Sequence, residues 1–210
     1  MNLVVQLIQV LGVASAAVSG VLAASRKQLD WFGATVIAMV TAVGGGTARD
    51  VFLGVRPVFW VTDPSYPLIA FAAALGSILL VRRRVVPKRS LLIVDAVALG
   101  AFSALGAHVA LAAGTAPSMA VVMGTMTSVV GGVFRDLLCA EVPFLFRGDV
   151  YAVAAIAGGA TYVAALPIVN SDGLATALGM AVSCTLRGAA IAFRVRVPAV
   201  PHHHTIADNG

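Results

Sequence analysis

Seven long runs of apolar residues constrain the fold of this sequence of 210 residues more than any other feature. A helix of about 20 apolar residues is long enough to cross the hydrocarbon core of a bilayer. Only 11% of the residues are charged, against about 25% in soluble domains, so a soluble core of this size would stay uncovered. We therefore predict an all-α polytopic membrane protein with seven transmembrane helices. The runs span residues 3–24, 31–48, 67–81, 91–113, 119–134, 150–169 and 173–193.

The basic residues are concentrated in alternate connections between these runs. With the N-terminus outside, the inner connections and tail hold Arg26, Lys27, Arg82, Arg83, Arg84, Lys88, Arg89, Arg147, Arg194 and Arg196. The outer connections after the fourth and sixth runs hold no Lys or Arg, and Arg56 is the clear exception. The positive-inside rule then predicts an outer N-terminus and a cytoplasmic C-terminus. The net charge of +5 indicates anionic lipid headgroups as partners, and not nucleic acid.

An internal repeat relates two parts of the chain at an offset of 86 residues. Residues 45–50 read Gly-Gly-Thr-Ala-Arg-Asp, and residues 131–136 read Gly-Gly-Val-Phe-Arg-Asp. The register extends to Thr41 with Thr127 and to Pro57 with Pro143. Each copy lies in the second run of a three-run unit, so the second unit crosses the membrane in the opposite sense.

The repeat predicts the organisation of the whole chain. We expect a 3+3 inverted repeat, with a seventh helix outside the symmetry. The predicted units are residues 1–88, the first three-helix repeat; 89–169, the second; 170–197, the seventh helix; and 198–210, a polar tail.

The glycines of the motif lie near the middle of two long segments. Trp31 to Trp60 and Pro117 to Phe146 are each 30 residues. As straight helices they would measure about 45 Å, against about 30 Å for the hydrocarbon core. We predict that these spans tilt strongly or break at the glycines and there expose carbonyl oxygens to a cation. The alternative is that the glycines only allow close helix packing. The predicted hinge is formed by Gly44, Gly45, Gly46, Gly131 and Gly132.

Four charged residues accompany the glycines: Arg49, Asp50, Arg135 and Asp136. Charges at membrane depth are costly and mark transport pathways, although a buried ion-pair lock without conduction is the alternative. Sequence neighbours point about 100° apart on a helix, so we expect pairing between the repeats, Arg49 with Asp136 and Arg135 with Asp50. Thr41 and Thr127 share a helical stripe with these arginines and are predicted to line the pore.

Three further polar residues lie in or near the spans. Asp95 pairs with the basic cluster of residues 82–89 or lies at the pore mouth, and Arg187 pairs within the bundle or binds a lipid phosphate. His108 is expected to be a hydrogen-bonded residue at the membrane interface. No catalytic set or metal cluster occurs at usable spacing, so we predict no enzyme activity, no metal and no cofactor.

The paired motifs, the 3+3+1 layout and the Pro-Val-Phe-Trp and Pro-Phe-Leu-Phe segments resemble the TRIC family of trimeric intracellular cation channels. The resemblance is to its short prokaryotic branch, also labelled glycine transporter, and covers Leu3 to about Pro198. It implies a homotrimer in a prokaryotic cytoplasmic membrane. Each protomer would conduct potassium and sodium through its own pore, between the glycine-kinked second and fifth helices.

The resemblance also implies a lipid ligand. In eukaryotic members, basic residues near the kinks hold a phosphoinositide, and the matching positions are Arg49 and Arg135. The lysine-containing signature of animal members is absent at Phe134-Arg135-Asp136, so an ordinary phospholipid is expected instead. The alternative function is a small-solute, glycine-type secondary transporter, because an inverted repeat also serves alternating access.

Overall fold

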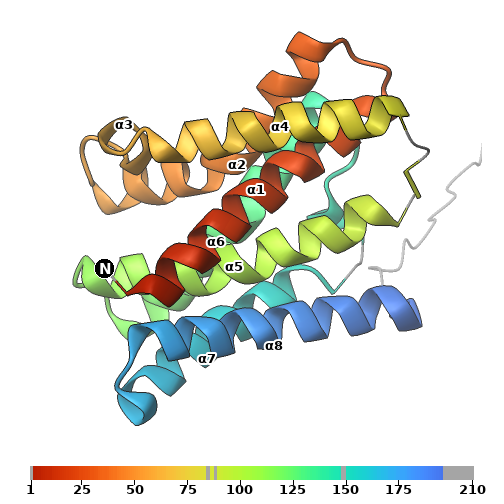
Figure 1. Ribbon diagram of the computed structural model, residues 1–210. Helices are drawn as coiled ribbons and strands as arrows, with labels where there is room; N and C mark the ends of the chain where they lie inside the picture. The colour runs from red at the N-terminus through yellow and green to blue at the C-terminus, as the bar shows by residue number, and fades with distance from the viewer. Residues whose placement is uncertain (1, 84–85, 88, 148–149, 196–210) are drawn as a thin grey trace, which may run out of the picture.

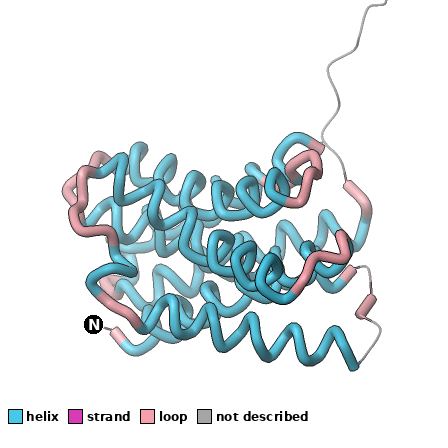
Figure 2. The backbone as a smooth tube through the Cα atoms, turned by 90° about the horizontal axis from the view of Figure 1, so that it is seen from above, coloured by secondary structure: helices cyan, strands magenta, loops and turns pink. Residues whose placement is uncertain are grey.

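The computed structural model describes residues 2–83, 86–87, 89–147 and 150–195, and over these ranges the only regular structure is helical (Figures 1 and 2). Seven of the helices are long and apolar enough to cross a membrane, which confirms the predicted number of spans. The elements are α1 Leu3–Arg26, α2 Trp31–Leu53, the short α3 Phe59–Thr62, α4 Ser65–Arg83, α5 Ser90–Ala112, α6 Pro117–Leu138, the 3-10 turn η1 Phe144–Phe146, α7 Ala152–Val169 and α8 Asp172–Phe193.

Local signals in the sequence set the ends of the helices. At the start of α2 the Asp30 carboxylate accepts a hydrogen bond from the Gly33 amide at 2.7 Å, which satisfies one of the free amides of the first turn. Pro117 begins α6, where its missing amide hydrogen costs nothing. α2 ends at Leu53 because Gly54 adopts the left-handed conformation, with φ of 69°.

The expected break at the motif glycines does not occur. α2 is helical through Gly44–Gly46 and α6 through Gly131–Gly132. Both helices instead end at Leu53 and Leu138, so each fits the membrane without interruption. The sequence stays apolar beyond the ends of α2 and α6 because the chain then folds back in two short apolar elements, α3 and η1. A helix can bend without losing its backbone hydrogen bonds, so a continuous helix does not test for a kink. The kink at these glycines stays a prediction.

The arrangement of the helices follows the inverted repeat. α5 packs against α1, α6, α7 and α8, while α2 packs against α1, α4 and α6. The equivalent helices α1 and α5 are in contact and run in opposite directions, as Figure 1 shows. α8, the helix outside the repeat, packs mainly on α5 and α7.

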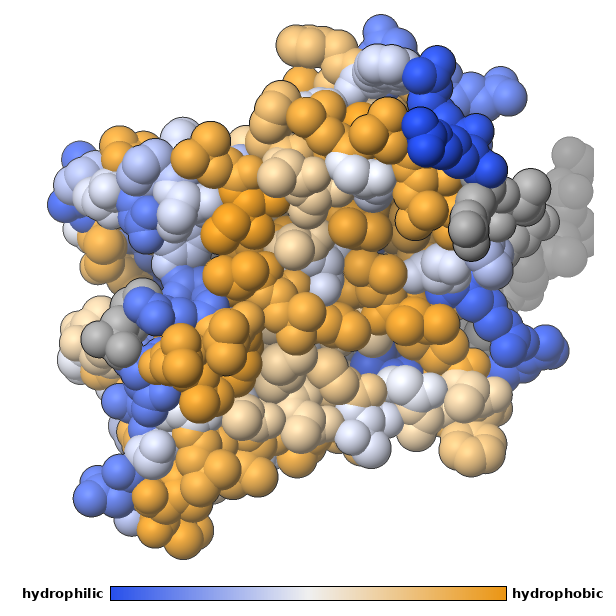
Figure 3. Space-filling model, viewed as in Figure 1, coloured by the Kyte–Doolittle hydropathy of each residue, from blue (hydrophilic) through white to orange (hydrophobic). Residues whose placement is uncertain are grey.

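The surface and interior divide as expected for a protein embedded in lipid. Large apolar side chains such as Phe32, Phe52, Leu80 and Ile168 are exposed. Figure 3 shows hydrophobic residues across the middle of the viewed face and hydrophilic residues gathered toward the two ends of the helices. The interior is rich in fully buried alanine and serine, which let helix backbones approach closely where no hydrophobic effect drives association.

Candidate functional site

The two motif helices, α2 and α6, touch each other backbone to backbone at their crossing. A Cβ atom on Gly45 would overlap the carbonyl oxygen of Thr127, and one on Gly131 would overlap the carbonyl oxygen of Thr41. The two contacts are related by the repeat. Both threonine hydroxyls donate to carbonyls of their own helices at 2.6 Å. At this point the glycines allow close packing, the alternative to a helix break.

The other motif glycines make room for aromatic side chains. A Cβ on Gly46 would lie 2.5 Å from the Phe59 ring, and one on Gly132 would lie 2.8 Å from the Tyr151 hydroxyl. Gly44 likewise faces an aromatic ring of α6. The glycines therefore place aromatic groups directly beside the charged end of each motif.

The first charged cluster is an ion pair between sequence neighbours. Nε and Nη2 of Arg49 donate to Oδ1 of Asp50 at 2.9 and 2.7 Å. The second carboxylate oxygen of Asp50 accepts from the Phe59 amide at 2.8 Å, and the Phe59 ring centroid lies 5.5 Å from the Arg49 guanidinium carbon. Both charged side chains are buried, so the pair and this amide satisfy each other away from bulk water.

The second charged cluster repeats this arrangement. Nε of Arg135 donates to Oδ1 of Asp136 at 2.8 Å, and Oδ2 of Asp136 accepts from the Phe144 amide at 3.0 Å. The Phe144 ring centroid lies 4.9 Å from the guanidinium carbon. In addition, Nη1 of Arg135 donates to Asp95 and to the Ser19 hydroxyl. Arg135 is thus held by two carboxylates and is completely buried.

The predicted pairing between the repeats is wrong. Arg49 and Arg135 each bind the aspartate that follows them in sequence. Each motif lies on the C-terminal side of the α2–α6 crossing, and the helices of an inverted repeat run in opposite senses, so the clusters lie on opposite sides of the crossing. The arginine side chain is also long enough to reach the next residue. Among the residues that the structure describes, Asp95 pairs with Arg135 and not with Arg82, Arg83 or Arg89 of the predicted basic cluster, whose Arg84 and Lys88 lie outside the described residues.

The two clusters differ at one position of the repeat. Gln9 in α1 corresponds to Asp95 in α5 at the offset of 86 residues. The position that supplies the second carboxylate to Arg135 is therefore a neutral amide in the first repeat, and both Gln9 and Arg49 line the same cavity. We call the first cluster open, because Arg49 lines a cavity and is held by one carboxylate. We call the second cluster closed, because Arg135 is held by two carboxylates and is completely buried.

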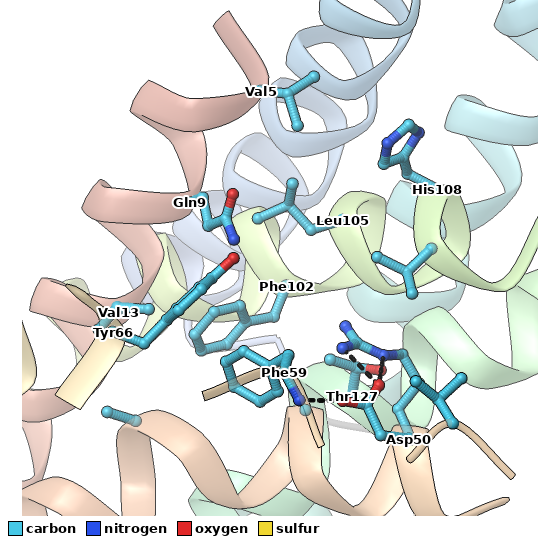
Figure 4. Close-up of a pocket in the computed structure, with 15 residues that line it drawn as sticks. Val5, Gln9, Val13, Asp50, Phe59, Tyr66, Phe102, Leu105, His108 and Thr127 are labelled. Atoms are coloured by element: carbon cyan, nitrogen blue, oxygen red, sulfur yellow. Dashed lines mark hydrogen bonds and ion pairs between the residues drawn. The ribbon is translucent and has the colours of Figure 1, made fainter. Parts of the chain in front are cut away.

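The open cluster lines a cavity of about 230 Å³ among α1, α2, α5 and α6, and α3 and α4 complete its wall (Figure 4). Its polar groups include Gln9, Asp50, Tyr66, His108 and Thr127. In Figure 4 the Gln9 and Tyr66 side chains point toward one another, and His108 lies at the far end of the cavity from them. The remaining lining is largely apolar, as in pockets that hold a small solute or ion with few ligands.

A smaller cavity of about 160 Å³ lies beside the closed cluster, lined by Asp136, Cys139 and a charged rim. On this rim Glu141 accepts from Lys27 at 2.6 Å and from Arg147 at 2.8 Å. The hydrogen bond and charge of Lys27, followed by those of Arg147, hold the pKa of Glu141 below its ordinary value. Burial raises the pKa of the Cys139 thiol. The two cavities flank the α2–α6 crossing from its two sides.

Several residues of these clusters were not anticipated from the sequence: Gln9, Ser19, Phe59, Phe144 and Tyr151. The repeat itself could have pointed to the two phenylalanines. Phe59 and Phe144 each come shortly after a proline that follows the Arg-Asp pair, and they lie 85 residues apart, one fewer than the offset of the motif.

Arg187 lies at the edge of the second cluster. It is buried in α8, and its guanidinium carbon lies 5.1 Å from the Tyr151 ring centroid.

His108, which also lines the larger cavity, belongs to a polar group that joins three helices. Its Nδ1 lies 2.9 Å from the Tyr162 hydroxyl, which donates to Asp172 at 3.1 Å. His108 is partly buried and hydrogen-bonded, in keeping with its predicted role.

Comparison with known sequences gives a consistent set of relatives. The sequence model of the family described as glycine transporter matches residues 6–82 and 92–167, two segments that begin 86 residues apart. The chain is 41% identical over 197 residues to the UPF0126 inner membrane protein YadS of Escherichia coli K12, covering 91% of this chain and 93% of the relative. A UPF0126 membrane protein of Vibrio cholerae is 40% identical over 196 residues, covering 91% and 81%.

Solved structures with the same fold are TRIC channels. The TRIC trimeric intracellular cation channel orthologue from Rhodobacter sphaeroides superposes with a TM-score of 0.87 at 37% identity, covering 92% of this chain and 100% of that one. A TRIC cation channel described in a study of conductance gives 0.85 at 30% identity, covering 95% and 98%. These relatives are channels and not enzymes, in agreement with the prediction for this chain.

The seven apolar helices and the inner-membrane relative together make this an integral membrane protein. The family match covers both halves of the repeat, and the relatives match almost the whole chain. The chain therefore belongs to the family that comprises the glycine-transporter sequence model, the UPF0126 membrane proteins and the TRIC cation channels.

Proposed function

We propose that this protein is a channel for monovalent cations, potassium and sodium, with one pore in each protomer of a homotrimer. Its N-terminus would lie outside and its C-terminus in the cytoplasm of a prokaryotic cell. The observation that carries the proposal is the pair of cavities flanking the α2–α6 crossing, each beside an Arg-Asp cluster. The solved relatives are described as cation channels, which supports the same function.

The path that we propose leads from the larger cavity, past the crossing, into the smaller one. Because α2 and α6 touch at Gly45 and Gly131, conduction requires these helices to separate there. The separation would uncover the carbonyl oxygens of Thr41 and Thr127, which are suitable ligands for a partly dehydrated cation. The glycines would then serve as a gate, because their lack of side chains permits both the closed contact and its opening.

The charges beside this path do not oppose a cation. Arg49 is neutralised by Asp50, and Arg135 by Asp95 and Asp136. The larger cavity also offers oxygen atoms from Gln9, Tyr66 and Thr127. These groups can replace part of the hydration shell of a monovalent cation without binding it tightly.

The phospholipid expected at the motif arginines fits one of them better than the other. Arg135 is completely enclosed by Asp95, Asp136 and Ser19, which leaves a phosphate no access. Arg49 lines the larger cavity and is held by a single carboxylate. We therefore propose Arg49 as the motif arginine that a lipid headgroup would approach.

A secondary transporter for a small solute such as glycine is the second candidate. Two cavities separated by a closed contact are also the geometry that alternating access requires. The description of the matching family model as glycine transporter favours this candidate as well.

Recording from the purified protein in a planar bilayer separates the two functions. Unitary potassium and sodium currents far above the turnover of a carrier are the result expected for a channel. Saturable uptake of glycine into proteoliposomes, with no unitary current in either salt, would overturn the channel assignment and establish the transporter.

A further inference from the structure

The smaller cavity, beside the closed cluster, has a buried floor and a charged rim. The floor is formed by Asp136, Cys139 and Phe144 together with Ala23 and Leu91, all of them buried. The exposed residues of its wall all carry charge, and they are Arg26, Lys27, Glu141 and Arg147. A solute that enters the cavity from this end of the molecule therefore has to pass between charged side chains.

Three of these side chains form one ion-pair bridge across the rim. One carboxylate oxygen of Glu141 lies 2.6 Å from Nζ of Lys27, and the other accepts a hydrogen bond from Nη2 of Arg147 at 2.8 Å. The Arg147 guanidinium also donates to the carbonyl oxygen of Val142 at 2.6 Å and lies 5.2 Å from the centroid of the Phe144 ring. Lys27 follows α1 in the first repeat, whereas Glu141 and Arg147 follow α6 and η1 in the second. The bridge therefore joins the two repeats at the mouth of the cavity.

The main chain on both sides of the bridge is held by the way in which α1 and α6 end. The Lys27 amide donates to the carbonyl oxygen of Ala24 at 3.0 Å. Ala140 adopts the left-handed conformation, with φ of 50°, and turns the chain so that the Glu141 amide donates to the carbonyl oxygen of Asp136 at 2.9 Å. Because the backbone is held in this way, the bridge can break and form by rotation of exposed side chains alone.

The bridge has no counterpart at the equivalent place in the other repeat. At the offset of 86 residues, Glu141 corresponds to Val55, which lines the larger cavity, and Lys27 corresponds to Ala113. Arg147 likewise corresponds to an uncharged residue, at an offset of either 86 or 85. The ion-pair bridge is thus a feature of one end of the molecule and not a general requirement of the fold.

We propose that this bridge is a lid of side chains over the smaller cavity, which blocks entry while it is formed and admits water and small solutes when Glu141 releases Lys27. Exposed ion pairs suit such a role because they are weak and are weakened further by salt. The lid is inferred from these contacts alone. Its effect on transport rests on the proposed function, in which the smaller cavity is part of the pathway.

Cys139 can report on the lid because it lines the cavity below the bridge. With Cys184→Ala it is the only cysteine of the chain. The test measures the rate at which the neutral reagent methyl methanethiosulfonate modifies Cys139 in the purified full-length protein in detergent. Lys27→Gln and Glu141→Gln should each raise this rate about fivefold, the effect on opening that loss of one exposed ion pair allows. Arg83→Gln, which removes a charge at the same end but outside the cavity, should leave the rate unchanged.

The two bridge variants separate access to the thiol from its reactivity. The Glu141 carboxylate disfavours the reactive thiolate of Cys139, whereas the Lys27 ammonium favours it. If charge alone changed the rate, Glu141→Gln would react faster and Lys27→Gln more slowly, and this result would overturn the proposal. Rates equal to that of Arg83→Gln would also overturn it. Unfolding temperatures close to that of the unchanged protein show that faster modification does not come from loss of the fold.

Salt provides a second test of the lid. Raising the salt concentration should speed the modification of Cys139 in the unchanged protein and have much less effect in Glu141→Gln, where the bridge is already broken. The same salt dependence in both proteins would contradict the lid.

Recording in planar bilayers tests the effect on transport separately. If the smaller cavity belongs to the pathway, Glu141→Gln should raise the fraction of time that the channel is open. Faster modification of Cys139 with unchanged currents would confirm the lid and contradict the proposed path. If the unchanged protein gave no unitary current, the channel assignment would fail, and the modification rates would still decide whether the lid exists.

Discussion

Adjacent arginine and aspartate residues on a helix form an ion pair here because the arginine side chain bends back toward its neighbour. Arg49 does so with Asp50, and Arg135 with Asp136. The angle between neighbouring side chains on a helix argued against such pairs, but it ignores the length and freedom of the arginine chain. In each case the second carboxylate oxygen of the aspartate accepts a hydrogen bond from a backbone amide where the chain folds back after the helix. One carboxylate therefore binds both the guanidinium group and the segment that follows its helix.

The carboxylate that distinguishes the two clusters allows a matched test. Asp95→Asn should lower the free energy of unfolding by about 3 kcal/mol, because it leaves the buried Arg135 with only one of its two charged partners. Gln9→Asn, at the equivalent position of the first repeat, should cost well under half of this. The measurement is urea or thermal unfolding in detergent. Equal effects of the two substitutions would contradict the assigned role of Asp95.

Glu141 should make the stability of the protein depend on pH. Its pKa is lowered in the folded protein by Lys27 and Arg147, so its contribution is complete above the pKa of the unfolded chain. That contribution is lost as the pH falls below about 4.5, the ordinary value, and through the lower folded pKa. Thermal unfolding between pH 7 and pH 3 should therefore show a smaller acid destabilisation in Glu141→Gln than in the unchanged protein. Asp30→Asn, which keeps a helix-capping side chain, serves as the control.

At the scale of elements, the crossing of α2 and α6 is the contact most sensitive to substitution. Gly45→Ala would put a methyl group onto the carbonyl oxygen of Thr127, which is main chain and can move only with its helix. We expect a loss of about 1–3 kcal/mol in unfolding free energy, together with an altered unitary conductance. Gly76→Ala is the matched control because nothing lies within 4 Å of its added Cβ. It should be neutral or slightly stabilising through helix propensity. Equal stability of the two variants would show that the crossing is loosely packed.

The number of spans was predictable from the sequence because membrane insertion depends on the length of the apolar runs. The repeat was predictable because the same motif occurs twice at a fixed offset. The ends of α2 and α6 were not, since α3 and η1 are themselves apolar and prolong the hydropathy signal beyond Leu53 and Leu138. The site was predictable in composition but not in pairing. Pairing depends on which residues the fold brings together, and the distant partners Ser19 and Asp95 of Arg135 carry no local signal.

At the scale of the whole molecule, the proposed orientation can be tested by accessibility. In a background carrying Cys139→Ala and Cys184→Ala, a single cysteine replaces either Asn170 or Arg83, both exposed at opposite ends of the bundle. A membrane-impermeant maleimide should label the Asn170→Cys variant in intact cells and the Arg83→Cys variant only after permeabilisation. The reverse pattern would mean that the chain is inserted the other way.

Equivalent positions of the two repeats hold a neutral residue, Gln9, and an acidic residue, Asp95. This difference makes the two sides of the molecule electrically unequal, although the backbone is nearly symmetric. One cavity borders a neutral Arg-Asp pair, and the other borders a cluster with an additional carboxylate. A cation crossing through both would meet a different electrical profile in each direction. If the protein conducts as proposed, such a pathway would pass current more easily in one direction than in the other, and the difference would come from a single side chain.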